Sequence, residues 1–136
     1  MYETINLIVE EGIATVTLNR PPVNPLNSKM FAELGQVAAE LEADPAVRVV
    51  IITGSGDKAF VAGADIKEME HFNAARARAF IDNLRELCEA VRQLKVPVIA
   101  RIPGWCLGGG LEFALACDLR IGSDQAKLGM PEVKVG

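Results

Sequence analysis

The 136-residue sequence predicts one α/β domain, residues 1–136, built on a largely parallel sheet. Segments with strand patterns alternate with segments of helical spacing in the order β-β-α-β-α-β-α-β, which is typical of parallel sheets joined by right-handed crossovers. The run VRVVIITGSG, residues 47–56, is β-branched, as in strands buried on both faces. Residues 80–94 instead place apolar side chains at spacings near three and four, which predicts a long amphipathic helix.

The chain begins with a predicted β-hairpin over residues 5–19, INLIVEEGIATVTLN. In its second half Ala14, Val16 and Leu18 alternate with their neighbours, which indicates a strand with one buried face. Glu11 and Gly12 separate the two halves and are expected to form the tight turn.

A proline-rich loop is predicted next, over residues 20–27, RPPVNPLN, and it is the only linker-like stretch in the sequence. Asn27 or Ser28 can cap the helix that follows, which ends at Asp44-Pro45. The apolar residues of this helix recur at helical spacing: Phe31, Leu34, Ala38 and Leu41. No internal repeat of fixed period is visible along the chain.

The second half of the chain predicts short strands and helices separated by glycine-rich turns. The expected elements are, in order, a loop at 59–69, the amphipathic helix, a strand at 96–102, a glycine-rich turn at 104–112, a buried helix at 111–118, a strand at 119–123 and a loop at 127–136.

Composition and charge exclude several classes of protein. The chain is 50% hydrophobic and 24% charged, and its net charge of −4 argues against nucleic acid or an anionic membrane as a partner. No apolar run approaches the ~18 residues of a spanning helix. The first residues lack the layout of a signal peptide, so we expect a cytoplasmic protein.

Three widely separated cysteines, Cys88, Cys106 and Cys117, are odd in number. They fit reduced, buried thiols and do not form the closely spaced pair that a zinc site needs. We therefore expect no metal site.

The candidate chemistry lies in the two turns that leave predicted strands, AFVAGADIKEM at 59–69 and GWCLGGGLE at 104–112. In parallel sheets, ligands bind at the carboxyl ends of strands. Glycines at a helix start let a ligand approach free N–H groups, which favour developing negative charge. The run matches neither the P-loop nor the dinucleotide fingerprint, and Glu112 would repel a phosphate, so a smaller oxyanion fits better.

Two alternatives stay open at this point. Gly108, Gly109 and Gly110 could instead serve close helix packing, with Glu112 an ordinary first-turn glutamate that the helix dipole favours. A second carboxylate, Glu132, follows twenty positions after Glu112, which is enough chain to return to the same end of the sheet. This spacing permits the two carboxylates to face one another without requiring it.

The motifs AFVAGADIKEM, IPGWCLGGGLEFALACDLRI and KLGMPEVKVG, in this order, resemble the enoyl-CoA hydratase (crotonase) family. The segment VTLNRPPVNPLN is similar to the N-terminal signature of that family, so the resemblance runs through the whole chain. It implies a crotonase-like repeated ββα spiral. It also implies hydration of a 2-enoyl-CoA to a 3-hydroxyacyl-CoA, with no cofactor because CoA is part of the substrate.

The resemblance also assigns roles to individual residues. Ala64 and Gly109 correspond to the oxyanion hole, whose backbone N–H groups bind the thioester oxygen, and Glu112 and Glu132 correspond to the two catalytic glutamates. Isomerases of this fold generally lack the earlier carboxylate, so both glutamates together favour hydration. The residues expected to bind the acyl-CoA substrate are Ala62, Ala64, Asp65, Ile66, Lys67, Gly108 and Gly109.

Family members are about twice as long as this chain, which predicts that the C-terminal helical trimerisation region is lacking here. Apolar surface meant for that region would then be exposed, and we expect a homo-oligomer, a trimer or hexamer in the full-length family. Two alternative functions follow from the resemblance: an inactive acyl-CoA-binding or oligomerising fragment, or an enoyl-CoA isomerase.

Overall fold

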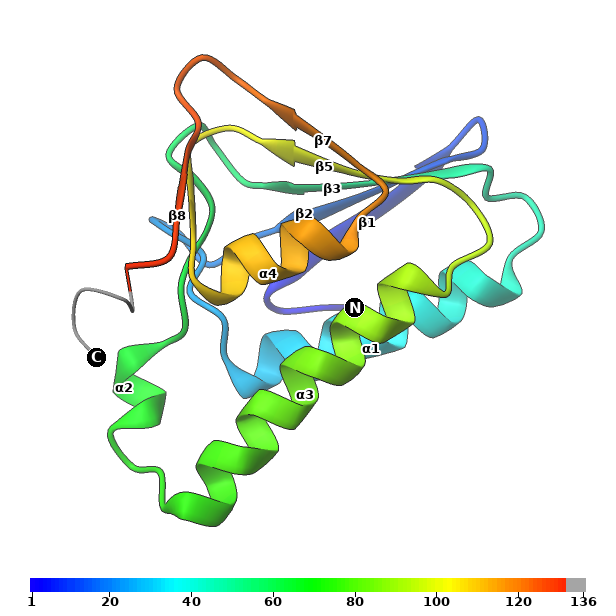
Figure 1. Cartoon of the computed structure of the whole chain (residues 1–136). Coiled ribbons are helices and arrows are strands. Elements are labelled where there is room, and N and C mark those ends of the chain that lie inside the picture. Colours follow the sequence, from blue (N-terminus) through cyan, green and yellow to red (C-terminus); the bar gives the residue numbers. More distant parts are fainter. Residues whose placement is uncertain (132–136) are drawn as a thin grey trace.

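The computed structural model describes residues 1–131 and confirms an α/β fold (Figure 1). The elements are β1 (Ile5–Glu10), β2 (Ile13–Leu18), α1 (Ser28–Ala43), β3 (Val49–Gly54), β4 (Ala59–Ala62), α2 (Ile66–Met69), α3 (Ala74–Arg92), β5 (Val98–Ile102), β6 (Trp105–Leu107), α4 (Gly109–Ala116), β7 (Leu119–Gly122) and β8 (Lys127–Gly129).

A five-stranded sheet with the order β1-β2-β3-β5-β7 forms the larger layer. The β1–β2 hairpin is antiparallel, and every other pairing in this sheet is parallel. Val50 and Val98 are paired opposite one another and both are buried, as the β-branched runs predicted. Helices α1, α3 and α4 lie on one side of this sheet (Figure 1).

A second, three-stranded parallel sheet with the order β4-β6-β8 was not predicted. Residues 59–62, 105–107 and 127–129 were expected to lie in loops or turns, and that expectation is wrong. These strands have three or four residues each, too few to produce a periodic sequence pattern. Backbone hydrogen bonds between these strands hold them extended, and the local sequence does not indicate this pairing.

The second sheet reveals a repeat of structure that the sequence conceals. The chain runs from a strand of the large sheet to a strand of the small sheet and then to helical structure, in β3-β4-α2-α3 and again in β5-β6-α4. The ββα spiral implied by the family resemblance is therefore confirmed, although no sequence period marks it.

Helix α1 begins at its predicted cap, and both α1 and α3 follow their predicted apolar stripes. Asn27 and Asn73 accept hydrogen bonds at the two N-termini, from the N–H groups of Met30 and Arg76. The apolar faces meet where the rings of Phe31 and Phe80 pack edge to face, with centroids 4.9 Å apart. Burying each such ring contributes about 1.5–3 kcal/mol to folding.

The loop predicted at residues 20–27 is found, and despite its linker-like composition it packs into the fold. Asn24 and Leu26 are fully buried. The Asn24 side chain accepts from the Arg20 N–H and donates to the carbonyls of Ala59 and Phe60 at the start of β4. A polar side chain that replaces backbone partners in this way is invisible to patterns based on hydrophobicity.

Helix α4 begins at Gly109, two residues earlier than predicted, and packs against β4 and β6 of the small sheet and against α3. Phe113 is fully buried and stacks on Phe60 of β4, with ring centroids 5.9 Å apart. The predicted burial holds for Gly110, Phe113, Ala114 and Ala116, whereas Leu115 and the first-turn residue Glu112 are exposed. This carboxylate therefore carries no burial penalty within the described part of the chain.

Candidate active site

The register of the small sheet positions the two predicted oxyanion-hole residues. Ala62 at the end of β4 is paired with Leu107 at the end of β6. Ala64 and Gly109 each follow two residues after this pair. Because the strands are parallel, both residues leave the sheet at the same end.

Leu26 fixes the orientation of the peptides around Ala64. The Leu26 N–H donates to the Gly63 carbonyl at 2.9 Å, and the Asp65 N–H donates to the Leu26 carbonyl at 2.8 Å. A trans peptide is planar, with its N–H opposed to its C=O, so the Ala64 N–H points away from Leu26. Within residues 1–131 no backbone acceptor is recorded for this N–H.

The Gly109 N–H belongs to the first turn of α4, where N–H groups have no partner in the helix. The preceding residue, Gly108, has φ of +55° and provides no side-chain cap. Its own N–H donates to the Gly129 carbonyl of β8 at 3.0 Å, which ties the start of α4 to the small sheet (Figure 1). A helix start of this kind favours negative charge.

Close packing explains one of the three glycines. A Cβ on Gly110 would lie 2.5 Å from the Val61 carbonyl oxygen, so only glycine lets α4 approach β4 this closely. A Cβ on Gly109 would lie 3.1 Å from Leu26 Cδ1, a tight contact that a shift of a few tenths of an ångström would relieve. The packing alternative left open by the sequence thus holds at Gly110 and does not account for Gly109.

The two candidate amides share a neighbour in Leu26. The Leu26 backbone forms an isolated parallel bridge with Ala64. Its Cδ1 atom is the nearest neighbour of a Cβ placed on Gly109. Leu26 is fully buried, so its position is fixed by the core. One rigid residue therefore sets the relative placement of both segments.

The motif AFVAGADIKEM, residues 59–69, continues into the short helix α2. Asp65 caps this helix by accepting from the N–H groups of Lys67 and Glu68, and its other oxygen binds the Arg20 guanidinium at 2.9 Å. Burial raises the pKa of Asp65, but the Arg20 and backbone hydrogen bonds outweigh burial and hold the pKa below its usual value. Ile66 and Lys67 are exposed on α2 and free to contact a ligand.

Of the two predicted glutamates, Glu112 alone lies within residues 1–131. Glu112 lies one turn into α4, three residues after Gly109, with its side chain exposed and its carbonyl 3.8 Å from the Cys88 thiol. Glu132 lies outside the described residues. The described strand nearest to it in sequence, β8, ends at Gly129, which is paired with Leu107.

Sequence reasoning assigned no role to Arg20, Asn24 or Leu26, although all three contact the segment from Ala59 to Asp65. One signal was available: Leu26 is an apolar residue directly before the N-cap of α1, where a packing contact is common. Nothing in the local sequence indicates that Arg20 pairs with Asp65, because the two residues lie 45 positions apart.

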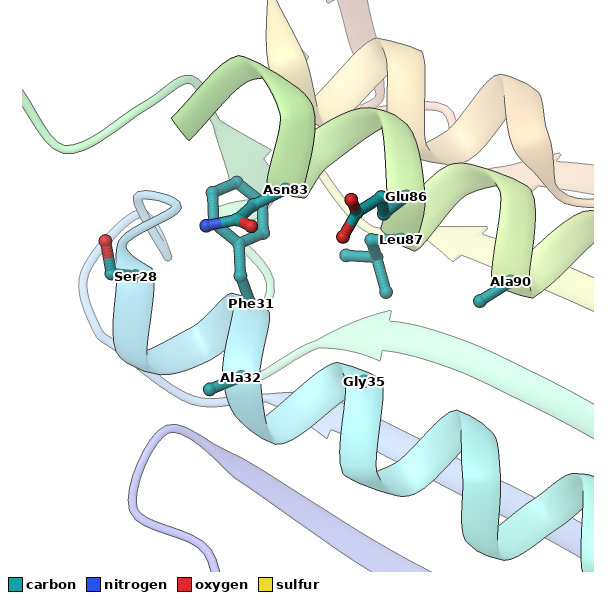
Figure 2. Close-up of a pocket in the computed structure, with 8 residues that line it drawn as sticks. All are labelled: Ser28, Phe31, Ala32, Gly35, Asn83, Glu86, Leu87 and Ala90. Atoms are coloured by element: carbon teal, nitrogen blue, oxygen red, sulfur yellow. The ribbon is translucent and has the colours of Figure 1, made fainter. Parts of the chain in front are cut away.

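A separate groove of about 390 Å³ lies between α1 and α3 (Figure 2). It is lined by Ser28, Phe31, Ala32, Gly35, Asn83, Glu86, Leu87 and Ala90. None of the predicted site residues is among them. This groove is therefore distinct from the candidate active site.

Known proteins resemble this chain along its full length. It is 44% identical to the crotonyl-CoA hydratase of Syntrophomonas wolfei, covering 99% of this chain and 52% of that protein. It is 46% identical to the short-chain-enoyl-CoA hydratase of Clostridium acetobutylicum, covering 98% and 52%. The crystal structure of an enoyl-CoA hydratase from Bacillus anthracis superposes with a TM-score of 0.95 at 38% identity, covering 98% of this chain and 53% of that one.

The chain thus spans about half the length of the relatives it matches. No helix within residues 1–131 is long and apolar enough to cross a membrane. The sequence profile described as enoyl-CoA hydratase/isomerase matches residues 9–136. Together with the relatives and the fold, this match shows that the chain belongs to the enoyl-CoA hydratase/isomerase family.

Proposed function

We propose that the chain carries the active-site half of an enoyl-CoA hydratase, which adds water reversibly to a 2-enoyl-CoA. One observation supports this above the others: the amides of Ala64 and Gly109 lie at matched positions beyond paired parallel strands, with no recorded acceptor among residues 1–131. The family and the names of its relatives agree with this assignment.

The oxyanion hole is the first part of the proposed mechanism. Addition of water to the double bond places negative charge on the thioester oxygen, and the two N–H groups stabilise that charge. Losing one donor of this kind typically costs about 2.7–4 kcal/mol of transition-state stabilisation. Because the donors are backbone groups, small residues at positions 64 and 109 suffice and leave room for the substrate.

Proton transfer is the second part. Glu112 accepts one proton from the water as its oxygen bonds to C3, and Glu132 donates one proton to Cα. Transfer of a proton from Glu112 to Glu132 then returns the pair to its starting state. Exposure of Glu112 leaves its carboxylate accessible to a water and substrate at the start of α4. The presence of both glutamates favours hydration over isomerisation.

The loop after β4 is the proposed contact with CoA. Ala62 and Ala64 leave space beside the chain, and exposed Lys67 supplies a positive charge for the phosphate groups of CoA. Gly108 and Gly109 permit the same close approach from the other side. No cofactor beyond the CoA of the substrate is required by this chemistry.

A second candidate is an acyl-CoA-binding or oligomerising module without turnover. The observation that favours it is a set of exposed apolar residues on α4, β7 and β8: Leu115, Leu119, Ile121 and Leu128. Each is more than half exposed, and such residues commonly lie in interfaces. A homo-oligomer, as a trimer or hexamer, is part of the proposal for either candidate.

Crotonyl-CoA distinguishes the two candidates. Hydration removes the absorbance of the conjugated enoyl thioester, and size-exclusion chromatography of the same sample gives the oligomeric state. We expect turnover that falls at least about 100-fold in Glu112→Gln, while Glu86→Gln on the exposed face of α3 leaves it unchanged.

Binding of crotonyl-CoA without turnover, by a folded chain, would instead establish the binding module. Turnover that survives Glu112→Gln at the normal rate would refute the role of Glu112.

A further inference from the structure

We infer that Arg20 is a positioning residue for the oxyanion hole, acting on the Ala64 amide through both sides of the Leu26–Ala64 bridge. This inference rests on the proposed function and adds to it a residue outside the substrate contacts. The observation behind it is that both hydrogen bonds of the Arg20 guanidinium are made within the protein, to Pro25 and Asp65.

The guanidinium of Arg20 joins the two chain segments of the bridge. Its Nη1 donates to the Pro25 carbonyl, one residue before Leu26, and its Nη2 donates to Asp65 Oδ2 at 2.9 Å, one residue after Ala64. A planar guanidinium can make both bonds at once with fixed geometry. Arg20 therefore connects the same two segments that the Leu26 backbone connects.

The hydrogen bonds of Asp65 extend this connection to the peptides that flank Ala64. The Asp65 N–H is bound to the Leu26 carbonyl, and Asp65 Oδ1 accepts from the first N–H groups of α2. Asp65 is thus held at its backbone and at both carboxylate oxygens. The Asp65 N–H lies in the peptide plane that follows Ala64, and the Ala64 N–H lies in the plane before it, whose Gly63 carbonyl accepts from the Leu26 N–H. Restraint of Asp65 therefore fixes one of the two planes that meet at Ala64, and Leu26 fixes the other.

Partial burial makes the ion pair stronger than a surface pair. The side chains of Arg20 and Asp65 are 26% and 15% exposed. The other three ion pairs within residues 1–131 have more exposed partners and longer separations, from 3.4 to 3.7 Å. Exposed pairs of that kind contribute little, whereas a charge-assisted pair next to a loop can fix its geometry.

Arg20→Met tests the inference, because it retains an unbranched side chain about as long as the Cβ-to-Nε part of arginine and removes both donors. Arg85→Met is the matched control, since Arg85 forms an exposed ion pair with Asp82 on α3. Arg20→Lys is the conservative variant, because an ammonium retains the charge but does not reproduce the planar fork.

Amide hydrogen exchange is the first measurement and does not depend on catalysis. The Leu26 and Asp65 N–H groups, which form the bridge, should exchange about 10-fold faster or more in Arg20→Met. The Val50 N–H, which donates to the Pro97 carbonyl in the large sheet, serves as the internal reference and should not change. Arg85→Met should leave the amides at both places unchanged, and Arg20→Lys should give an intermediate rate.

Steady-state kinetics with crotonyl-CoA is the second measurement. A displaced oxyanion donor weakens an interaction made in the transition state, so kcat should fall about 10- to 100-fold while KM stays within about twofold. A purely structural role would lower the folded fraction and leave kcat per folded molecule intact. Arg20→Lys should recover part of the lost kcat.

The outcomes separate this inference from the proposed function. If the wild-type chain does not hydrate crotonyl-CoA, the proposed function fails and exchange alone decides whether Arg20 holds the bridge. If exchange at Leu26 and Asp65 matches the Arg85→Met control, the inference is overturned. It is also overturned if exchange increases but kcat does not fall, because the bridge would then be held without consequence for the reaction.

Discussion

Two glycine-to-alanine substitutions, at Gly35 and Gly110, should have opposite effects on stability. Both glycines lie inside helices, α1 and α4, where alanine is intrinsically favoured by about 0.5–1 kcal/mol. A Cβ on Gly35 meets nothing within 4 Å, on the wall of the groove in Figure 2. Gly35→Ala should therefore raise the free energy of unfolding by about the intrinsic difference.

At Gly110 the same methyl group has no space. It would lie 2.5 Å from the Val61 carbonyl oxygen and 2.6 Å from Val61 Cβ, and neither atom moves without moving β4. Overpacking of this kind costs about 1–3 kcal/mol, which exceeds the gain in helix propensity. Gly110→Ala should thus lower the free energy of unfolding by about 1–2 kcal/mol net, which corresponds to a few degrees in Tm.

The functional consequence should be larger than the loss of stability. Relief of the clash moves the start of α4 away from β4, and the Gly109 N–H moves with it. A displacement near 1 Å of a catalytic group can cost about 100-fold in rate. We expect Gly110→Ala to reduce hydration of crotonyl-CoA by about 10- to 100-fold per folded molecule, with Gly35→Ala at the wild-type rate.

Urea unfolding followed by circular dichroism, with kinetics on the same preparations, measures both effects. The reasoning is refuted if Gly110→Ala is as stable as Gly35→Ala, because α4 would then tolerate a side chain against β4. It is refuted for the site alone if Gly110→Ala is destabilised but hydrates at the normal rate.

Two further predictions concern stability and thiol chemistry. Glu33 of α1 is 4% exposed and accepts hydrogen bonds from the N–H and hydroxyl of Thr4, so Glu33→Gln should lower the free energy of unfolding at pH 7 by about 2–3 kcal/mol in urea titrations. Burial raises the pKa of Glu33, but the Thr4 hydroxyl and the neighbouring amides outweigh it and lower the pKa overall. The stabilisation should therefore be complete above about pH 5 and lost as the pH falls through the folded pKa, and a constant difference between the two proteins down to acid pH would contradict this. Burial raises the pKa of Cys106 to about 11 and that of Cys117 to about 12, so a thiol reagent near pH 8 should label them only after denaturation; rapid labelling of the native chain would contradict this.

The sequence predicted the elements whose signals are local. The hairpin, the caps at Asn27 and Asp44 and the stripe of α3 are each encoded within a few turns of chain, and all were found. The small sheet was missed because β4, β6 and β8 owe their extended form to pairing between residues about 20 to 45 positions apart. A three-residue strand such as Trp105–Leu107 has no periodicity to detect.

The residues of the candidate site also fall into two groups, those that local sequence can suggest and those that only the fold brings together. Glycine and glutamate residues carry their chemistry in the residue type, so Gly109 and Glu112 could be selected from the sequence. Arg20 and Leu26 act through partners that only the fold brings together, and neither residue type suggests a site. Ala64 was selected only through the family resemblance, because the proposed role of this alanine belongs to its backbone N–H, which no property of its side chain reveals.

Hydrogen bonds link the candidate amides to the residues that only the fold brings near them. The neighbours of the candidate amides are satisfied: Leu26 binds Gly63, Asp65 binds Leu26, and Gly108 binds Gly129. A backbone N–H can act on a ligand only when the groups around it are held, because a loose peptide would turn to satisfy its own hydrogen bonds. The proline-rich loop, which looked like a linker in the sequence, supplies this restraint through Arg20, Asn24 and Leu26. A site made of backbone amides is thus specified mainly by residues that never contact the substrate, and such residues should be sought wherever a glycine-rich helix start lacks a side-chain cap.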